Sequence, residues 1–144
     1  SERQKSEIAE HLKGFGFELI DDKKSRLIDI IKTLIIELVH QQNAQLNTNL
    51  SDYLSKQLTQ DYSSLSNLFS EVEDTTIEKY FINQKIEKMK ELLLYDELTL
   101  NEIAFQMNYS SVAYLSNQFK KVTGFSPSHY KQLKNNKRKQ IEDL

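Results

Sequence analysis

Residues 115–130, which read LSNQFKKVTGFSPSHY, constrain the fold most strongly because they specify a helix, its end and the start of another helix. Leu115 and Phe119 are four residues apart, as on the buried stripe of an amphipathic helix, and the residues between them are polar. Gly124 can take the left-handed conformation that closes a helix. The Ser-Pro pair that follows is a typical cap and first residue of the next helix. The segment therefore predicts two helices joined by a tight turn, the first with a polar face suited to an anionic surface.

Composition favours helices elsewhere in the chain and excludes several other classes. The 144 residues include three glycines and one proline, so long helices are expected. A hydrophobic content of 38% suffices for one or two small cores and excludes a disordered chain. The absence of cysteine excludes a disulfide framework and a thiolate metal site. No apolar run approaches the roughly 18–20 residues of a membrane helix, and no signal peptide is visible, so a soluble, cytoplasmic protein without a membrane partner is expected.

The N-terminal residues 1–22 predict a short helix followed by a strand. The helix covers residues 3–13, and residues 17–20 look extended after a Gly-Phe-Gly break. An isolated strand cannot pair its edges, so we interpret this segment as the tail of an upstream module, such as a ferredoxin-like metal-binding domain, through which any dimerisation would occur. The alternative is a flexible or swapped N-terminal arm.

Residues 23–74 are predicted to form a first helical subdomain. It begins with a helix over residues 23–40 and continues, after a polar linker at 41–49, with two helices that turn at residues 59–61. The helix over residues 23–40 has a wide apolar stripe at helical spacing, made of Leu27, Ile30, Ile31, Leu34, Ile35, Leu38 and Val39. The last has a core stripe made of Leu65, Leu68, Phe69 and Val72.

Residues 75–94 predict a long connecting helix. Thr75 and Glu78 have the spacing of a capping box, and apolar residues then repeat at helical spacing as far as Leu93. About 19 residues at a rise of 1.5 Å make a rod of roughly 28 Å.

Residues 95–134 predict a second helix-turn-helix subdomain. Thr99 and Glu102 have the spacing of another capping box. Asn108 lies in the expected turn and tolerates the left-handed conformation, and the helix after the turn should start at residue 110 or 111 and end at residue 122. The inner face of the helix before the turn consists of Leu100, Ile103, Ala104 and Met107.

Residues 99–131, TLNEIAFQMNYSSVAYLSNQFKKVTGFSPSHYK, resemble the second helix-turn-helix of the AraC/XylS-type transcriptional regulators. The similarity includes the spacing of the inner-face residues, the turn, Phe119-Lys120-Lys121, and the Thr-Gly and Ser-Pro pairs that follow. Over residues 24–134 the resemblance implies an all-α fold of two tandem helix-turn-helix subdomains joined by a long linker helix. The function it implies is that of a sequence-specific bacterial transcription regulator that places two recognition helices in adjacent major grooves of double-stranded DNA.

The resemblance also implies, position by position, which residues contact DNA. In the first subdomain these are Ser63, Ser66 and Asn67, at base edges. In the second, Ser110 and Ser111 lie at the helix N-terminus, whose N–H groups face a phosphate, and Lys120 and Lys121 face the backbone. The residues that point into the groove are Val112, Ala113, Ser116 and Asn117. Because Asn bonds adenine in bidentate fashion and Val or Ala contacts the thymine methyl group, a site with a preference for A·T pairs is expected.

The first subdomain departs from the family pattern. Glu73-Asp74 stands where the family has a residue followed by glycine, and Glu71 and Glu73 are acidic where basic phosphate contacts are common. Residues 1–75 contain 8 Lys/Arg and 13 Asp/Glu, whereas residues 76–144 contain 11 and 8. Because DNA affinity depends on local positive charge, we expect the first subdomain to bind more weakly than the second.

Several side chains have two possible roles at this point. Lys85 and Lys88 face either phosphates or solvent, as do the basic residues of a predicted C-terminal tail at 135–144. Tyr114 either packs or contacts phosphate, whereas Phe125 is expected in the core together with Leu115 and Phe119.

Other classes of function find little in the sequence. His11, His40 and His129 are scattered, without the spacing of a metal site, and no phosphate-binding loop or nucleophile elbow is present. We therefore expect neither an enzyme nor a cofactor. The alternative is a helical protein-interaction module with degenerate helix-turn-helix units and no DNA binding. RNA polymerase is a further candidate partner for a regulator of this type.

Overall fold

The computed structural model describes residues 22–142, and every regular element in that range is a helix. A first helix covers residues 22–40. It is followed by α2 (Leu50–Leu58), α3 (Tyr62–Glu73), α4 (Ile77–Tyr95), α5 (Leu100–Gln106), α6 (Val112–Thr123) and α7 (Pro127–Glu142). The all-α prediction is confirmed. The helix and strand predicted in the N-terminal tail lie outside the described residues.

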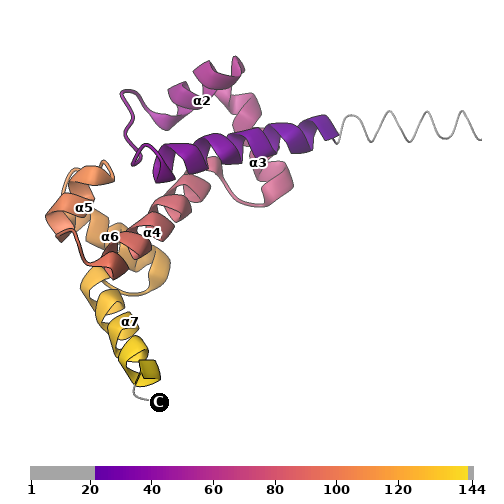
Figure 1. The fold of residues 1–144 in the computed structure, drawn as a ribbon. Helices are drawn as coiled ribbons and strands as arrows, with labels where there is room; N and C mark the ends of the chain where they lie inside the picture. Colours follow the sequence, from indigo (N-terminus) through magenta and orange to yellow (C-terminus); the bar gives the residue numbers. More distant parts are fainter. Residues whose placement is uncertain (1–21, 143–144) are drawn as a thin grey trace, which may run out of the picture.

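The long helix α4 joins two helical units (Figure 1). The first unit, α2 and α3, lies with the first helix near the N-terminal end of α4. In the second unit, α5 follows the C-terminal end of α4, and α6 packs along α4. Helix α7 packs on α4 and α6 and then extends away from the second unit. It continues without a break past residue 134, so the basic residues predicted as a tail are helical through residue 142. The predicted subdomain boundaries remain predictions.

The two units are related by an internal repeat of fifty residues. The sequence Leu-Ser-Asn-x-Phe occurs at residues 65–69 and again at residues 115–119. In both copies the Leu and the Phe are buried, and the Phe packs edge-on against a tyrosine eleven residues later. The ring centroids of Phe69 and Tyr80 are 5.7 Å apart, and those of Phe119 and Tyr130 are 5.5 Å apart. Both units therefore use one packing scheme, which gives α3 and α6 equivalent exposed faces.

Three residues predicted to be buried are exposed: Ile30 (46%), Val72 (50%) and Phe125 (39%). The first helix instead buries a narrower stripe that includes Ile28, because the elements that pack on this helix cover only part of its apolar surface. Val72 lies in the last turn of α3, on the side away from the core. Phe125 follows the helix-ending Gly124 and packs edge-on against His129, with 5.3 Å between the ring centroids.

The helix ends follow the predicted capping chemistry with one correction. Thr99 accepts the backbone N–H of Glu102 at 3.2 Å and donates its hydroxyl to the Glu102 carboxylate at 3.1 Å. The start of α4 is different, because Thr76 rather than Thr75 is the cap. It accepts the backbone N–H of Lys79 at 3.1 Å. The capping box predicted from Thr75 is therefore wrong by one residue, and the carboxylate of Glu78 bonds the Tyr62 hydroxyl of α3 instead.

Candidate nucleic-acid interface

The second unit presents one polar face along α6. Leu115 and Phe119 face the core, which turns Ala113, Asn117 and Lys120 outward at helical spacing, all exposed. The residues one position earlier on the same side, Val112 and Ser116, are half-buried. Of the residues predicted from the sequence to enter a groove, Ala113 and Asn117 therefore protrude furthest. Val112 and Ser116 lie at the edge of the same face.

The N-terminus of α6 is held by Ser111. Its hydroxyl accepts the backbone N–H of Tyr114 at 3.0 Å, so this side chain is engaged in capping. Ser110, one residue earlier, is exposed. The remaining N–H groups of the first turn have no partner within the helix, and the positive end of the helix dipole adds to their attraction for an anion.

The C-terminal turn of α6 carries Lys120 and Lys121, both exposed. Within residues 22–142, neither of them forms an ion pair; the salt bridges found there involve Lys32, Lys88, Lys90 and Lys131. Lys121 also lines a groove of about 410 Å³ between α6 and α4, together with Lys79, Ile82, Asn83, Gln118 and Val122. Sequence reasoning missed Lys79, because only the packing of α4 on α6 brings it to the same groove as Lys121.

An aromatic cluster supports the start of α6. The Tyr109 ring is buried at 8% exposure and lies 5.6 Å from the Tyr114 ring, and the Tyr109 hydroxyl bonds the Gln118 side chain. Tyr114 thus packs while remaining 55% exposed. The Lys85 ammonium lies 4.1 Å from the Tyr109 ring centroid, so it contacts an aromatic ring rather than pointing freely to solvent. Burial lowers the pKa of Lys85 to about 8.

The first unit presents a similar face on α3 with a different charge. Ser63 and Asn67 are exposed and Ser66 is half-buried, as at the equivalent positions of α6. Glu73 pairs with Lys32 of the first helix, 2.8 Å from Nζ to Oε1, and this hydrogen bond raises the pKa of Lys32. Glu71 is exposed and has no ion pair within the described residues. The two carboxylates are therefore not equivalent, because only Glu73 is neutralised.

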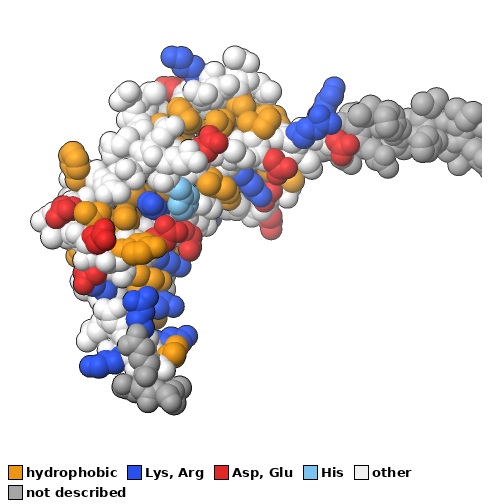
Figure 2. All heavy atoms as spheres, viewed as in Figure 1, with side chains coloured by type: hydrophobic (Ala, Val, Ile, Leu, Met, Phe, Trp, Pro, Cys, Tyr) orange, Lys and Arg blue, Asp and Glu red, His pale blue; other side chains and the backbone are white. Residues whose placement is uncertain are grey.

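Within residues 22–142, no group of His, Asp and Glu side chains is arranged to hold a metal ion. The same part of the chain contains no helix that is long and apolar enough to cross a membrane. Basic and acidic side chains are unevenly spread over its surface, with Lys and Arg side chains prominent along α7 (Figure 2).

Comparison with known proteins identifies the family. The family model described as "Helix-turn-helix domain" matches residues 54–133. No curated protein matches the sequence. Among solved structures, the C-terminal domain of the two-component response regulator yesN from Fusobacterium nucleatum is 31% identical, with 69% of this chain and 96% of that chain covered and a TM-score of 0.60.

Two further structures are similar in fold. The C-terminal domain of AraT, a response regulator from Geobacillus stearothermophilus, is 25% identical, with coverage of 74% and 84% and a TM-score of 0.65. The DNA-binding domain of AdpA, a global transcriptional factor solved with a target DNA, is 17% identical, with coverage of 78% and 96% and a TM-score of 0.66. These comparisons confirm the resemblance seen in the sequence, and the chain belongs to the AraC/XylS-type helix-turn-helix family of DNA-binding transcription regulators.

Proposed function

We propose that this chain is a sequence-specific transcription regulator that inserts α3 and α6 into adjacent major grooves of double-stranded DNA. The observation that carries the proposal is the repeat of one exposed polar helix face on two units that a single helix joins. A major groove admits one α-helix and displays a distinct pattern of donors and acceptors for each base pair. Family membership supports DNA binding, and the repeated faces support the choice of α3 and α6.

The length of the connecting helix supports adjacent grooves. Helix α4 has 19 residues, which at 1.5 Å per residue gives a length of roughly 28 Å. Successive major-groove openings on one side of B-DNA are roughly 34 Å apart. Two units joined by a helix of this length can therefore present recognition helices one DNA turn apart.

In the second unit we assign base contacts to the exposed middle of α6. Asn117 would bond an adenine edge in bidentate fashion, and Ala113 with Val112 would contact a thymine methyl group. Ser116 lies beside them and would add a hydrogen bond. In the first unit, Ser63, Ser66 and Asn67 would take the equivalent positions on α3.

Phosphate contacts are assigned to the ends of α6. At its N-terminus, the free N–H groups and the Ser110 hydroxyl would bind one phosphate, as helix N-termini do, while Ser111 holds the helix start in place. At its C-terminus, Lys120 and Lys121 would bind the backbone, together with Lys79 across the groove.

Equilibrium binding to labelled duplex DNA at several salt concentrations tests the proposal. Affinity should fall steeply as salt rises from about 50 to 200 mM, because each neutralised phosphate releases counterions. A site selected from a random pool should bind more tightly than random DNA, and Lys120→Ala should weaken binding to both alike while lowering the salt slope by about one unit. Absence of binding at low salt, or binding without a salt slope, would instead support the protein-interaction alternative.

A further inference from the structure

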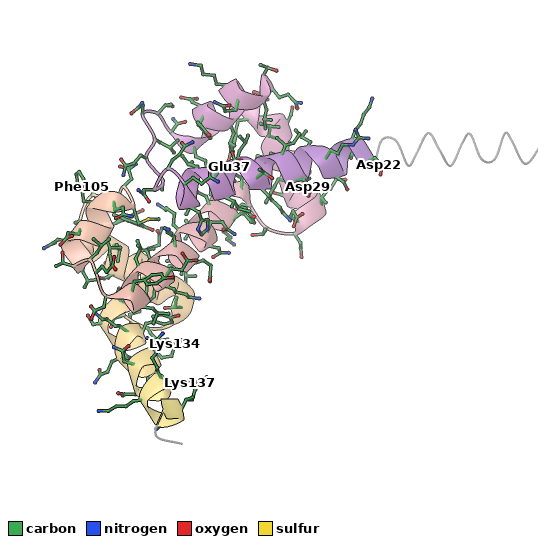
Figure 3. The ribbon with its side chains drawn as sticks, viewed as in Figure 1. Asp22, Asp29, Glu37, Phe105, Lys134 and Lys137 are labelled. Atoms are coloured by element: carbon green, nitrogen blue, oxygen red, sulfur yellow. The ribbon has the colours of Figure 1, made fainter. Side chains whose placement is uncertain are left out.

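The two units also touch directly, where the loop that follows the first helix meets the end of α5. The Gln45 amide donates to the carbonyl oxygen of Gln106 at 2.8 Å and to that of Phe105 at 3.3 Å. In return, the Gln106 amide donates to the Asn43 side-chain oxygen at 3.1 Å. Figure 1 shows this loop beside α5, and Figure 3 shows the Phe105 side chain pointing outward from the same end of α5.

The acceptors in this contact are groups that a helix cannot satisfy by itself. The last four carbonyl groups of an α-helix have no N–H partner within the helix. The Phe105 carbonyl accepts one further bond, from the backbone N–H of Asn108 at 3.2 Å. For the Gln106 carbonyl, Gln45 is the one donor found among the described residues. A side chain that precedes the first unit thus caps a helix of the second.

The backbone conformation of the loop places Gln45 at the end of α5. Asn43 and Ala44 are both left-handed, with φ of 56° and 57°, a conformation that non-glycine residues adopt at a cost. Ala44 is buried at 1% exposure, and its N–H donates to the Leu38 carbonyl at 2.8 Å. Because burial and hydrogen bonding hold this turn at the end of the first helix, the position of Gln45 is set by the core of the first unit.

A bond at the end of α5 acts on the orientation of α6. Only the five residues 107–111 separate the two helices. Ile103 and Ala104 of α5 and Leu115 of α6 are buried, and the two helices pack directly on each other, so α5 and α6 move together. A single connecting helix can bend and twist along its axis, whereas a second attachment on one side of that axis restricts both motions.

We infer that Asn43 and Gln45 form an orientation clamp that fixes α6 relative to α3 and thereby restricts the spacing between the two half-sites that the chain accepts on DNA. Both are positioning residues, since they act through α5. The part that concerns DNA spacing rests on the proposed function. The part that concerns the orientation of the helices applies to the free protein and is testable without DNA.

The orientation is tested by the distance between spin labels on the two helices. Because the chain contains no cysteine, Ser63→Cys and Ala113→Cys provide unique labelling sites at equivalent, exposed positions of α3 and α6. Gln45→Ala and the isosteric Gln45→Glu, which lacks the donor, should both broaden the distance distribution. Gln42→Ala is the matched control, since Gln42 lies in the same loop and its side chain makes no hydrogen bond within the described residues. Unchanged distributions in both Gln45 variants would overturn the clamp.

The DNA part is tested with a selected site and copies that carry one extra or one fewer base pair between the half-sites, bound by chains without labels. The unmutated chain and Gln42→Ala should discriminate strongly against altered spacing, and Gln45→Ala should reduce that discrimination by about fivefold to tenfold, the scale of one net hydrogen bond. Equal discrimination in all three chains would overturn the role in spacing. If the unmutated chain binds no DNA, the proposed function fails, while the label distances still decide whether the clamp exists.

Discussion

The ammonium group of Lys85 lies 4.1 Å from the centroid of the Tyr109 ring and 4.9 Å from that of Phe81. This contact joins the middle of α4 to the residue that leads from the turn of the second unit into α6. A cation over a ring face is attracted to it, but the same burial removes water from the charge. The desolvation lowers the pKa of Lys85 from 10.5 to about 8.

The pKa of Lys85 predicts how stability changes with pH. Between pH 8 and 10.5 the unfolded chain binds a proton at this site that the folded chain has lost, so unfolding takes up a proton and stability rises with pH. We expect a gain of about 2 kcal/mol between pH 8 and 10, since one pKa unit corresponds to about 1.4 kcal/mol. Urea unfolding at a series of pH values measures it.

Two features of that experiment separate Lys85 from other groups. Burial raises the pKa of Tyr109 and of Tyr62, so above about pH 10, where unfolded tyrosines ionise, these groups reverse the trend. Lys85→Met should abolish the rise below that pH. Lys88→Met, three residues further along α4, should retain it, and a rise that persists in Lys85→Met would assign the effect to another group.

Local features of the sequence predicted the helix ends, because capping and turn chemistry involve neighbouring residues. Asn108 and Gly124 take the left-handed conformation, with φ of 64° and 86°, and Ser126 accepts the backbone N–H of His129. Apart from the cap of α4, which is Thr76 rather than Thr75, the predictions that failed depend on partners distant in sequence. The exposure of Val72 reflects what covers α3, and the contact of Lys85 with Tyr109 requires the packing of two elements. The contact of Gln45 with α5 also requires the packing of two elements, because in the sequence Gln45 is one of several polar linker residues.

Asp74→Gly should stabilise the protein by about 0.5–1 kcal/mol, because Asp74 ends α3 in the left-handed conformation, with φ of 56°, and glycine adopts it without strain. Thermal unfolding measures the change. Glu71→Gly is the control, because it also removes a negative charge from α3 but places glycine at a helical position, where it should destabilise the protein. A gain in stability in Asp74→Gly alone would therefore come from relieved backbone strain and not from the lost charge. A loss of stability in Asp74→Gly would contradict the assignment of strain.

At the equivalent helix end in the second unit, Gly124→Ala should cost about 1 kcal/mol. A Cβ atom there meets nothing within 4 Å, so the cost comes from the backbone conformation alone. Thermal unfolding of this variant beside Asp74→Gly should therefore show changes of opposite sign. A neutral Gly124→Ala would mean that the turn relaxes without loss.

Glu71→Lys should strengthen DNA binding if α3 enters a groove. Glu71 occupies the position on α3 that Lys121 occupies on α6, and it is exposed without an ion pair within residues 22–142. Replacing a repulsive charge by an attractive one should steepen the salt dependence by about one to two units of slope. Titrations at several salt concentrations measure it, with Asp22→Lys on the outer part of the first helix (Figure 3) as a charge-matched control. Equal changes in both variants would indicate a general field effect rather than a contact on α3.

If α3 and α6 both enter grooves as proposed, they should contribute unequally to sequence discrimination. Asn117 and Asn67 are exposed at equivalent positions, but α6 ends with two lysines where α3 has Ser70 and Glu71. Because phosphate contacts hold a helix in register for its base contacts, Asn117→Ala should abolish a preference worth about 1–3 kcal/mol at one base pair, whereas Asn67→Ala should cost clearly less. Binding to duplexes with single base-pair changes across a selected site measures both, and losses of the same size would show that the lysines of α6 do not make it the dominant recognition helix.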